Sequence, residues 1–420
     1  MRKLILALVA AALIAPMAMA QDIDYDFNIM GTGARARGMG GAFIGVADDA
    51  TAVGWNPAGL AQLDKMEASA VGLFNMLKYS SEVTIGTTSE TYTGSASHIA
   101  PAFASFVVPV KTGNRNIAFA VAYQRMIDMG NTAKGSEDDP FLGTYTWIYE
   151  ATGGMDAISP AAAIQLSENF SLGLAANIYM NGLKYNYDEN YASISSWDKY
   201  KYEEKYSGFN LNAGALVSLQ KFSIGAMARF PFSLGVDVTE SNTWDYTANG
   251  GNAGTVTNTM TGAEFSMPMM LGFGVAVKPT DKLTLAADYE IRSYSNSEFS
   301  YQGYTDNAGM NDCNQIRVGM EYILTGPSAV FPVRLGFRTD PRTYDGFKGT
   351  FSNPDTSQAS GTVITGGFGL IMGKMMLDLA YEYGSIKPVD VSEDFGGTLV
   401  AMKTEQKSHN IMLSLIYHFK

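Results

Sequence analysis

The sequence has a single cysteine, Cys313, and only three histidines among its 420 residues. One cysteine excludes an intrachain disulfide and any cluster of cysteine metal ligands. None of the histidines is spaced with a serine and an acid as a hydrolase would require. Acidic residues outnumber basic ones, 41 to 29, and the net charge of −12 argues against nucleic acid as a partner. We therefore expect no enzyme, no metal site and no cofactor.

Long apolar runs are also missing after residue 20, so no transmembrane helix is expected there. Before that point, Arg2 and Lys3 precede an apolar run that ends in Ala18, Met19 and Ala20. This order is typical of a secretory signal peptide, residues 1–20, cleaved after Ala20. The alternative, an uncleaved membrane anchor, would need a longer apolar run. The chain is thus predicted to leave the cytoplasm.

Glycine and aromatic residues, by contrast, are abundant, with 44 Gly, 23 Tyr and 22 Phe. In residues 282–292, Leu283, Leu285 and Tyr289 share one face of an extended chain while charged residues share the other. The same alternation recurs at 316–324, 333–338, 377–383 and 409–419. Both a large soluble β protein and a membrane barrel alternate in this way.

The spacing between alternating segments separates these two classes. Short turns alternate with long polar tracts, as the turns and loops at opposite ends of an outer-membrane barrel do. The turns lie at 111–115, 166–170, 218–222, 278–282, 325–330 and 373–374, and the tracts at 80–98, 128–154, 186–206, 239–262, 295–312, 340–361 and 386–404. Residues 65–420 are therefore predicted to be all-β, a fourteen-stranded antiparallel transmembrane barrel in the outer membrane of a Gram-negative bacterium.

Residues 21–64 precede the first predicted strand and include "GGAFIGVADDATAVGWNPAGLAQL". A fourteen-stranded barrel is wide enough that wall side chains alone need not fill it. Asp48 or Asp49 can cap one helical turn, and Asn56 followed by Pro57 can begin another. We predict a small, partly helical hatch inside the lumen. An N-terminal arm outside the barrel with the same caps is the alternative.

Charged residues at inward-facing positions allow two interpretations. One is a network of ion pairs that includes Arg35, Arg37, Asp48 and Asp49, and the other is a path for a substrate. The wall residues concerned are Asp288, Glu290, Arg292, Arg317, Glu321, Arg334, Arg338, Asp378 and Glu382.

Four prolines fall near the outer rim of the predicted strands: Pro101, Pro160, Pro231 and Pro268. Proline removes a hydrogen bond from the ladder. These prolines indicate either bulges above the membrane or a gap in the wall.

The segment "GMGGAFIGVADDATAVGWNPAGLAQL" resembles the N-terminal hatch of the FadL/TodX family, outer-membrane transporters of long-chain fatty acids and other hydrophobic compounds. Asn56, Pro57 and Ala58 match the family's Asn-Pro-Ala motif. The resemblance continues in "ISPAAAIQLSENFSLGLAANI", "LGFGVAVKPTDKLTLAADYE" and "RLGFRTDP". It implies passive uptake through an apolar pocket, a hatch that shifts and a lateral opening in the wall.

On this resemblance, gating belongs to the hatch residues Asn56, Pro57, Ala58, Gly59, Asp48 and Asp49. The family's lateral opening lies at a kink in the third strand, but this chain has no Gly or Pro within 116–128, so that position is not carried over. The resemblance assigns the capture surface to the loops after the fifth and seventh strands. In the first of these the candidates are Tyr187, Tyr191, Trp197, Tyr200 and Tyr202.

These aromatic side chains could pack on alkyl or aromatic substrates, or form part of an interfacial girdle. A candidate pocket comprises Phe43, Trp55, Met267, Met269 and Met270. Methionine suits an adaptable pocket, but the three methionines could equally face lipid or the rim.

The sequence thus predicts passive uptake of hydrophobic small molecules such as fatty acids or hydrocarbons. The alternative is a non-transporting barrel of the same broad superfamily that serves secretion or surface attachment, because a start like "GARARGMGGAF" also occurs there. The predicted partners are a hydrophobic ligand, outer-membrane lipid and lipopolysaccharide, and the barrel-assembly machinery. The protein is expected to be a monomer.

Overall fold

The computed structural model describes residues 29–113, 115–139 and 143–419. The predicted signal peptide lies outside these residues. Within them, no helix is long and apolar enough to cross a bilayer. The chain begins with three short helices, namely α2 (Ala34–Gly38), α3 (Ala52–Trp55) and the 3-10 helix η2 (Pro57–Gln62).

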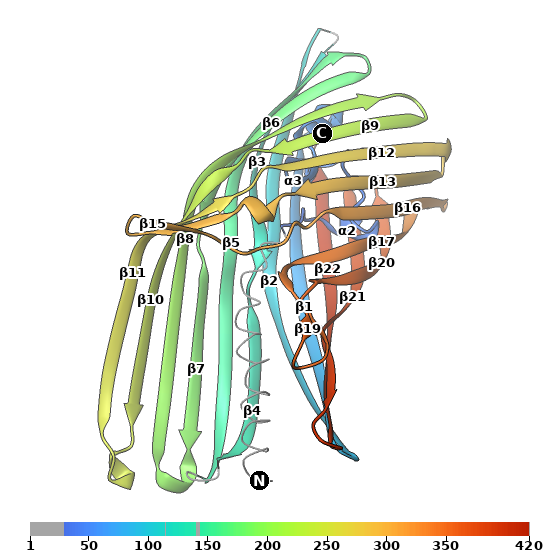
Figure 1. Cartoon of the computed structure of the whole chain (residues 1–420). Coiled ribbons are helices and arrows are strands. Elements are labelled where there is room, and N and C mark those ends of the chain that lie inside the picture. Colours follow the sequence, from blue (N-terminus) through green and yellow to red (C-terminus); the bar gives the residue numbers. More distant parts are fainter. Residues whose placement is uncertain (1–28, 114, 140–142, 420) are drawn as a thin grey trace.

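The rest of the described chain is a closed ring of antiparallel strands (Figure 1). Each wall strand pairs with the next, and β22 pairs with β1 from Glu67↔His418 to Ile85↔Val400. The fourteen wall strands are β1 (Glu67–Ile85), β2 (Thr88–Thr112), β3 (Arg115–Asp128), β5 (Gly143–Ser167), β6 (Phe170–Met180), β8 (Ser196–Ser218), β9 (Phe222–Arg229), β12 (Met270–Thr280), β13 (Leu283–Arg292), β16 (Gln315–Thr325), β17 (Val330–Asp345), β20 (Gln358–Met372), β21 (Met375–Asp394) and β22 (Leu399–His418). The all-β, fourteen-stranded fold is therefore confirmed.

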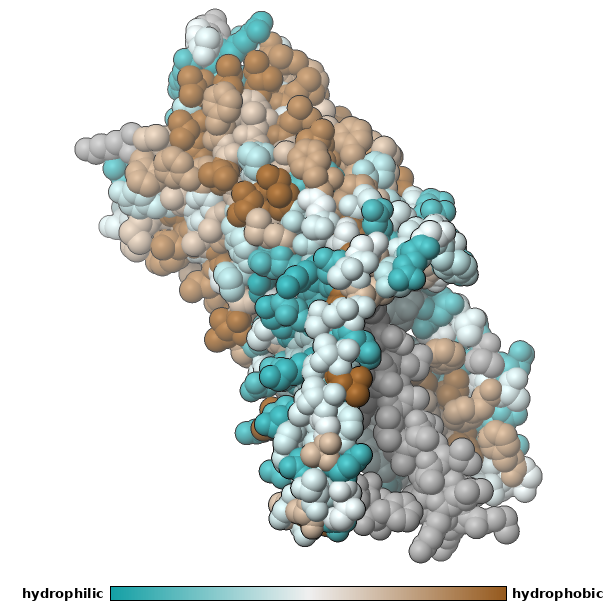
Figure 2. Space-filling view, turned by 90° about the vertical axis from the view of Figure 1, so that its left-hand side faces the viewer, coloured by the Kyte–Doolittle hydropathy of each residue, from teal (hydrophilic) through white to brown (hydrophobic). Residues whose placement is uncertain are grey.

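The alternation that predicted the strands divides them into an apolar outer face and an inner face. On β22, Ile411, Leu413 and Leu415 are exposed, whereas Met412 and Ser414 between them are buried. Figure 2 shows apolar side chains gathered over the barrel end and polar ones over the opposite end. An apolar band of this kind is what a barrel presents to lipid tails.

The long polar tracts were expected to be loops, and here the prediction was wrong. Several tracts continue the flanking strands, as in the β1–β2 hairpin, which turns only at Gly86, φ 63°, and Thr87. Residues 295–312 do not, because neither neighbouring wall strand extends into them. Threonine and tyrosine favour extended backbone, but a strand with two polar faces shows no apolar alternation. A search for apolar periodicity therefore stops too early.

These strand extensions form two separate groups at one end of the barrel (Figure 1). The first arm consists of the outer parts of β5 and β8 together with β4 (Asn131–Asp139), β7 (Leu183–Tyr191), β10 (Phe232–Asp245) and β11 (Ala253–Met267). The second arm consists of the outer parts of β1, β2, β17, β20, β21 and β22.

Small elements complete the described chain. They are η3 (Ala192–Ile194), η4 (Thr247–Asn249), η5 (Tyr294–Asn296), β14 (Glu298–Tyr301), β15 (Tyr304–Asn307), β18 (Phe347–Gly349) and β19 (Pro354–Asp355).

The wall divides between β2 and β3. The two strands pair from Thr112↔Arg115 only as far as Phe103↔Gln124, and Pro101 follows at once on the outer side. Proline has no N–H to continue that ladder. On the other side of the divide, β3 shifts register against β5 between Arg125 and Ile127. Both interpretations of the prolines therefore apply at Pro101, because β2 also bulges there, where its pairing with β1 skips a residue between Gly72↔Pro101 and Val71↔Phe103.

The other prolines have different places. Pro231 separates β9 from β10, and Pro268 lies between β11 and β12 on the neighbouring strand. Both therefore mark the level at which the first arm leaves the barrel. Pro160 lies within β5, opposite Val121.

Candidate functional site

Residues 29–64, called the plug below, lie within the ring of strands (Figure 1). Their backbone bends at glycines with positive φ, such as Gly33 at the start of α2 and the pair Gly40 and Gly41. At the start of η2, the Asn56 side chain accepts a hydrogen bond from the Ala58 N–H, as the sequence predicted for an N-cap. The predicted boundary at residue 64 falls between η2 and β1.

The plug approaches the wall so closely that side chains are excluded along a belt of wall glycines. A β-carbon on Gly214 would overlap the Asn56 carboxamide, and one on Gly173 would overlap Pro57 and Ala58. The belt crosses six strands, with Gly173, Gly214, Gly225, Gly274, Gly319 and Gly336 on β6, β8, β9, β12, β16 and β17. The abundance of glycine therefore has a structural role at these positions, because plug backbone occupies the space of the missing side chains.

Polar contacts fix the plug at the same level. The Asn56 amide donates to Ile44 O within the plug at 3.0 Å and to Ala215 O of β8 at 3.1 Å. The Asp288 carboxylate of β13 accepts the backbone N–H groups of Phe43 and Ile44 at 2.7 and 2.9 Å. These bonds satisfy plug groups that could not otherwise be buried.

One chain of buried ion pairs joins the plug to three wall strands. Arg35 binds Asp48 within the plug at 2.6 Å and Glu321 of β16 at 3.0 Å. Glu321 also binds Arg334 of β17 at 2.7 Å, and Arg334 binds Asp378 of β21 at 2.6 Å. The charges are thus paired, as the network interpretation predicted.

Two further groups of charges complete the network. Glu382 of β21, which is fully buried, accepts from Arg37 of the plug at 2.6 Å and from Arg338 of β17 at 2.7 Å. Glu290 pairs with Arg292 and Arg317 at 2.7 and 2.6 Å. Buried charges need such partners, because an unpaired charge in this environment is strongly destabilising.

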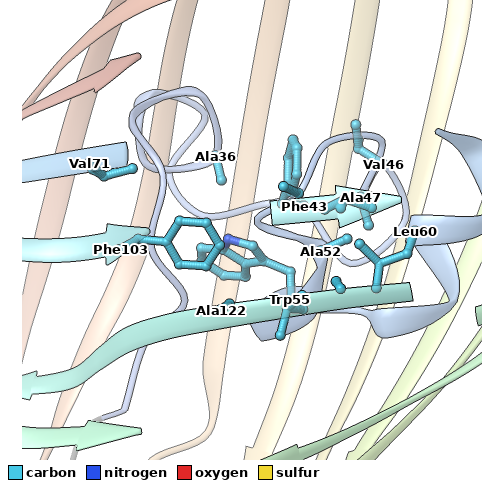
Figure 3. Close-up of a cluster of buried hydrophobic side chains, with 14 of the residues drawn as sticks. Ala36, Phe43, Val46, Ala47, Ala52, Trp55, Leu60, Val71, Phe103 and Ala122 are labelled. Atoms are coloured by element: carbon cyan, nitrogen blue, oxygen red, sulfur yellow. The ribbon is translucent and has the colours of Figure 1, made fainter. Parts of the chain in front are cut away.

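The centre of the plug is apolar (Figure 3). The Phe43 and Trp55 rings meet edge to face at 6.3 Å, and both side chains are buried. The Arg317 guanidinium lies 5.3 Å from the Trp55 ring, and the indole N–H donates to Thr32 O at 2.8 Å. Aromatic packing and a cation–π contact therefore add to the ion pairs.

Beside the plug, on the side of β1, β3 and β22, lies a cavity of about 310 Å³. Four guanidinium groups contribute to its lining, those of Arg37, Arg125, Arg338 and Arg342. Amides such as Asn75 and Asn410 and backbone from the β3–β4 break add to it. Apolar side chains such as those of Leu73, Met126 and Met412 also line the cavity, so its lining is mixed.

Sequence reasoning missed the residues at the base of the wall divide. Arg125 of β3 binds Asp156 of β5 through two bonds of 2.9 and 3.2 Å and also binds Asp128 at 3.2 Å. His98 of β2 reaches Asp128 at 2.5 Å and so connects the two sides of the divide. Because the register shifts at Arg125, a strict alternation of inward and outward side chains does not predict where these residues point. The occurrence of Arg125 and Asp128 close together in sequence was the one indication of an ion pair here.

The family model described as BamG matches residues 6–388. The chain belongs to the BamG family. The resemblance to the FadL/TodX family therefore predicted the fold correctly. It did not predict the family, which is BamG. No curated protein matches the chain.

Solved structures show what the BamG chain is similar to in fold. A Pseudomonas aeruginosa FadL homologue is 14% identical, with a TM-score of 0.60 over 94% of this chain and 100% of that one. The P. putida toluene transporter TodX is 13% identical, with a TM-score of 0.59 over 93% and 99%. The Ralstonia pickettii toluene transporter TbuX is 15% identical, with a TM-score of 0.55 over 94% and 100%. Identities this low establish the fold alone.

The structure places the predicted gating residues of the BamG chain together. Asn56, Pro57, Ala58 and Gly59 are buried around η2, and a β-carbon on Gly59 would overlap the Ala47 backbone. Nearby, the Asp49 carboxylate accepts from the Thr51 N–H at 2.9 Å, and Asp48 binds Arg35. Whether these residues gate remains a prediction.

The predicted capture aromatics lie on the first arm and pack on other aromatic rings. Tyr191 stacks on Tyr145 at 4.9 Å, and Tyr202 stacks on Tyr185 at 5.0 Å. Tyr200 donates to Glu240 at 2.7 Å, and this bond, with one from Asn258, lowers the pKa of the Glu240 carboxyl.

The two remaining capture residues also have partners on this arm. The Tyr187 ring centroid lies 6.3 Å from that of Trp147, and the Lys199 ammonium lies 5.3 Å from the Trp197 ring centroid in a cation–π contact. Capture of a ligand by these five aromatic residues remains a prediction.

The candidate pocket residues are not brought together. Phe43 and Trp55 are in the plug core, whereas Met267 and Met270 are buried in a second apolar cluster near the β11–β12 break. Met269 is 41% exposed on the outer face. None of these five residues lines the cavity beside the plug.

Proposed function

We propose that this BamG-family chain is a sealed barrel of the Gram-negative outer membrane that acts with the barrel-assembly machinery. The observation that carries the proposal is the attachment of the plug to the wall by buried ion pairs and the glycine belt. The name of the BamG family also supports a role in barrel assembly. Lipid and lipopolysaccharide would surround the barrel, which needs no cofactor.

The energetics disfavour a hatch that moves for each transported molecule. A buried charge left without its partner costs about 3–5 kcal/mol, and a shift of the plug would have to find new partners or water for Arg35 and Arg37, which each pair with the wall. A ligand can shift a conformation only by its difference in affinity between the two states. The binding free energy of a small ligand is at most about 1.5 kcal/mol per heavy atom, and it falls to about 0.3 kcal/mol per heavy atom for larger ligands.

Uptake of hydrophobic small molecules is the second candidate. It is supported by likeness in fold to the toluene transporters TodX and TbuX, and by the divided wall beside the cavity. The two functions differ in whether the plug must move. They also differ in the substrate, which is an unfolded barrel protein in the first case and a fatty acid or hydrocarbon in the second.

Depletion of the chain from its own cells separates them. The measurements are the folded fraction of several unrelated outer-membrane barrels, read from their heat-dependent gel shift, and uptake of labelled toluene and a labelled long-chain fatty acid. The assembly role predicts a lower folded fraction in newly made barrels within one generation. Normal barrel folding together with lost uptake would establish the second candidate instead.

A further inference from the structure

The divide between β2 and β3 leaves one edge of the outer part of β2 without a strand partner among the described residues. Residues 88–101 of β2 pair with β1 on one side, and pairing with β3 begins only at Phe103. Part of β4 comes close to β2, but no ladder joins these two strands. A sheet edge of this kind presents a row of backbone donors and acceptors that a further strand can use.

The hairpin geometry identifies which groups point to that edge. Ile85 and Thr88 flank the two-residue turn, so they exchange both hydrogen bonds, and the pattern then alternates along the ladder. Thr88, Glu90 and Tyr92 therefore bond to β1. The backbone groups that point to the other edge are those of Ser89, Thr91, Thr93, Ser95 and Ser97.

This edge is rigid. β1 is held on its other side by β22 as far as Ile85↔Val400, so β2 is the last strand of a continuous sheet. Gly94 pairs with Tyr79, whose ring lies over it, because a β-carbon on Gly94 would overlap that ring. A fixed edge costs little further ordering when a partner strand is added.

The two edges of the divide differ in composition. Proteins protect free edges with charged residues and proline. β4, across the divide, carries the charged Lys134, whose side chain is exposed. The outward-bonding positions of β2 are Ser and Thr, and the side chains of Ser89, Thr91, Thr93 and Ser95 are exposed. The unprotected edge is thus the one on β2.

We propose that this β2 edge, residues 89–97, binds an extended strand of another polypeptide in the assembly complex by β-strand addition. The inference rests on the proposed function, because an assembly complex is where such strands are present. Main-chain hydrogen bonds would supply the affinity and make the site tolerant of sequence.

The test uses the full-length chain purified in its complex from the outer membrane, compared with the same chain after release. Residue-resolved hydrogen exchange should show the Thr91, Thr93 and Ser95 amides slowed by about fivefold or more in the complex. The Glu90 and Tyr92 amides, which already bond to β1, should be unchanged. Equal exchange at all five amides in both states would overturn the inference and leave the assembly role standing.

A matched pair of variants provides the second measurement. Thr93→Pro removes one outward N–H, whereas Thr93→Val keeps it, and the heat-dependent gel shift verifies that both barrels fold. We expect Thr93→Pro to lower recovery of the partner by about fivefold or more and Thr93→Val to leave it unchanged. Equal recovery contradicts the inference, as does self-cross-linking of Ser95→Cys, which would place a second copy on the edge. A chain that purifies alone would contradict the assembly role itself.

Discussion

Asn56 reaches the barrel wall because residue 214 is glycine: a β-carbon at position 214 would overlap the Asn56 Oδ1 atom. In the space this leaves, the Asn56 amide bonds to Ala215 O, and its carboxamide oxygen starts η2. Gly214→Ala should therefore displace η2 and destabilise the plug by about 1–3 kcal/mol. Hydrogen exchange of residues 52–62 should become faster.

Gly366→Ala is the matched control, because a β-carbon there would meet only Arg334 O at 4.0 Å. It should leave exchange of the plug unchanged. If Gly214→Ala were equally silent, the close approach of plug and wall would not be a source of stability.

Glu382 should be among the most sensitive of the charged residues, because it is fully buried and compensates one arginine of the plug and one of the wall. In Glu382→Gln, Arg37 and Arg338 both lose their buried partner, which should cost about 3–5 kcal/mol. The temperature at which the heat-dependent gel shift occurs measures the loss.

Glu405→Gln serves as the exposed counterpart. The Glu405 and Lys407 side chains are 33% and 39% exposed, so removing this pair should cost no more than about 1 kcal/mol. Equal effects of the two substitutions would mean that burial does not govern the strength of the network.

The plug should also seal the barrel to ions. We expect the purified chain to show no conductance in a planar bilayer, and a variant lacking residues 29–64 to form an open channel, because a fourteen-stranded wall leaves a lumen that its own side chains do not fill. Only preparations that retain the gel shift are compared. A conducting full-length chain would contradict the sealed barrel.

The sequence carried enough information to predict the wall and the presence of the plug. Apolar alternation, as in residues 282–292, identifies strands because lipid faces one side of them, and Asn56-Pro57 marks a helical start. Alternation also placed Glu321 and Arg334 on the inner face. It could not select their partners, because pairing depends on the register between strands and on where the plug lies.

The outer ends of the strands could not be predicted for a different reason. Residues 88–97 are polar on both faces, so no periodicity separates a strand from a loop there. Pro101 was recognised as a break in the ladder, but only strand pairing shows that β2 leaves β3 at that point. Residues of the plug and of several strands together line the cavity beside the plug, so no local sequence pattern predicts it.

The most direct test of the account locks the plug to the wall. The Ala34 N–H donates to Ser414 Oγ on β22 at 2.8 Å, so the cross-link is sought here with Ala34→Cys and Ser414→Cys in a Cys313→Ser background, and a non-reducing gel verifies that the disulfide has formed. The measurement is the folded fraction of newly made outer-membrane barrels in cells that carry only the locked chain. A plug that stays in place predicts the same folded fraction with the disulfide oxidised or reduced. Loss of barrel folding, or of hydrophobic uptake, in the oxidised state alone would contradict the account.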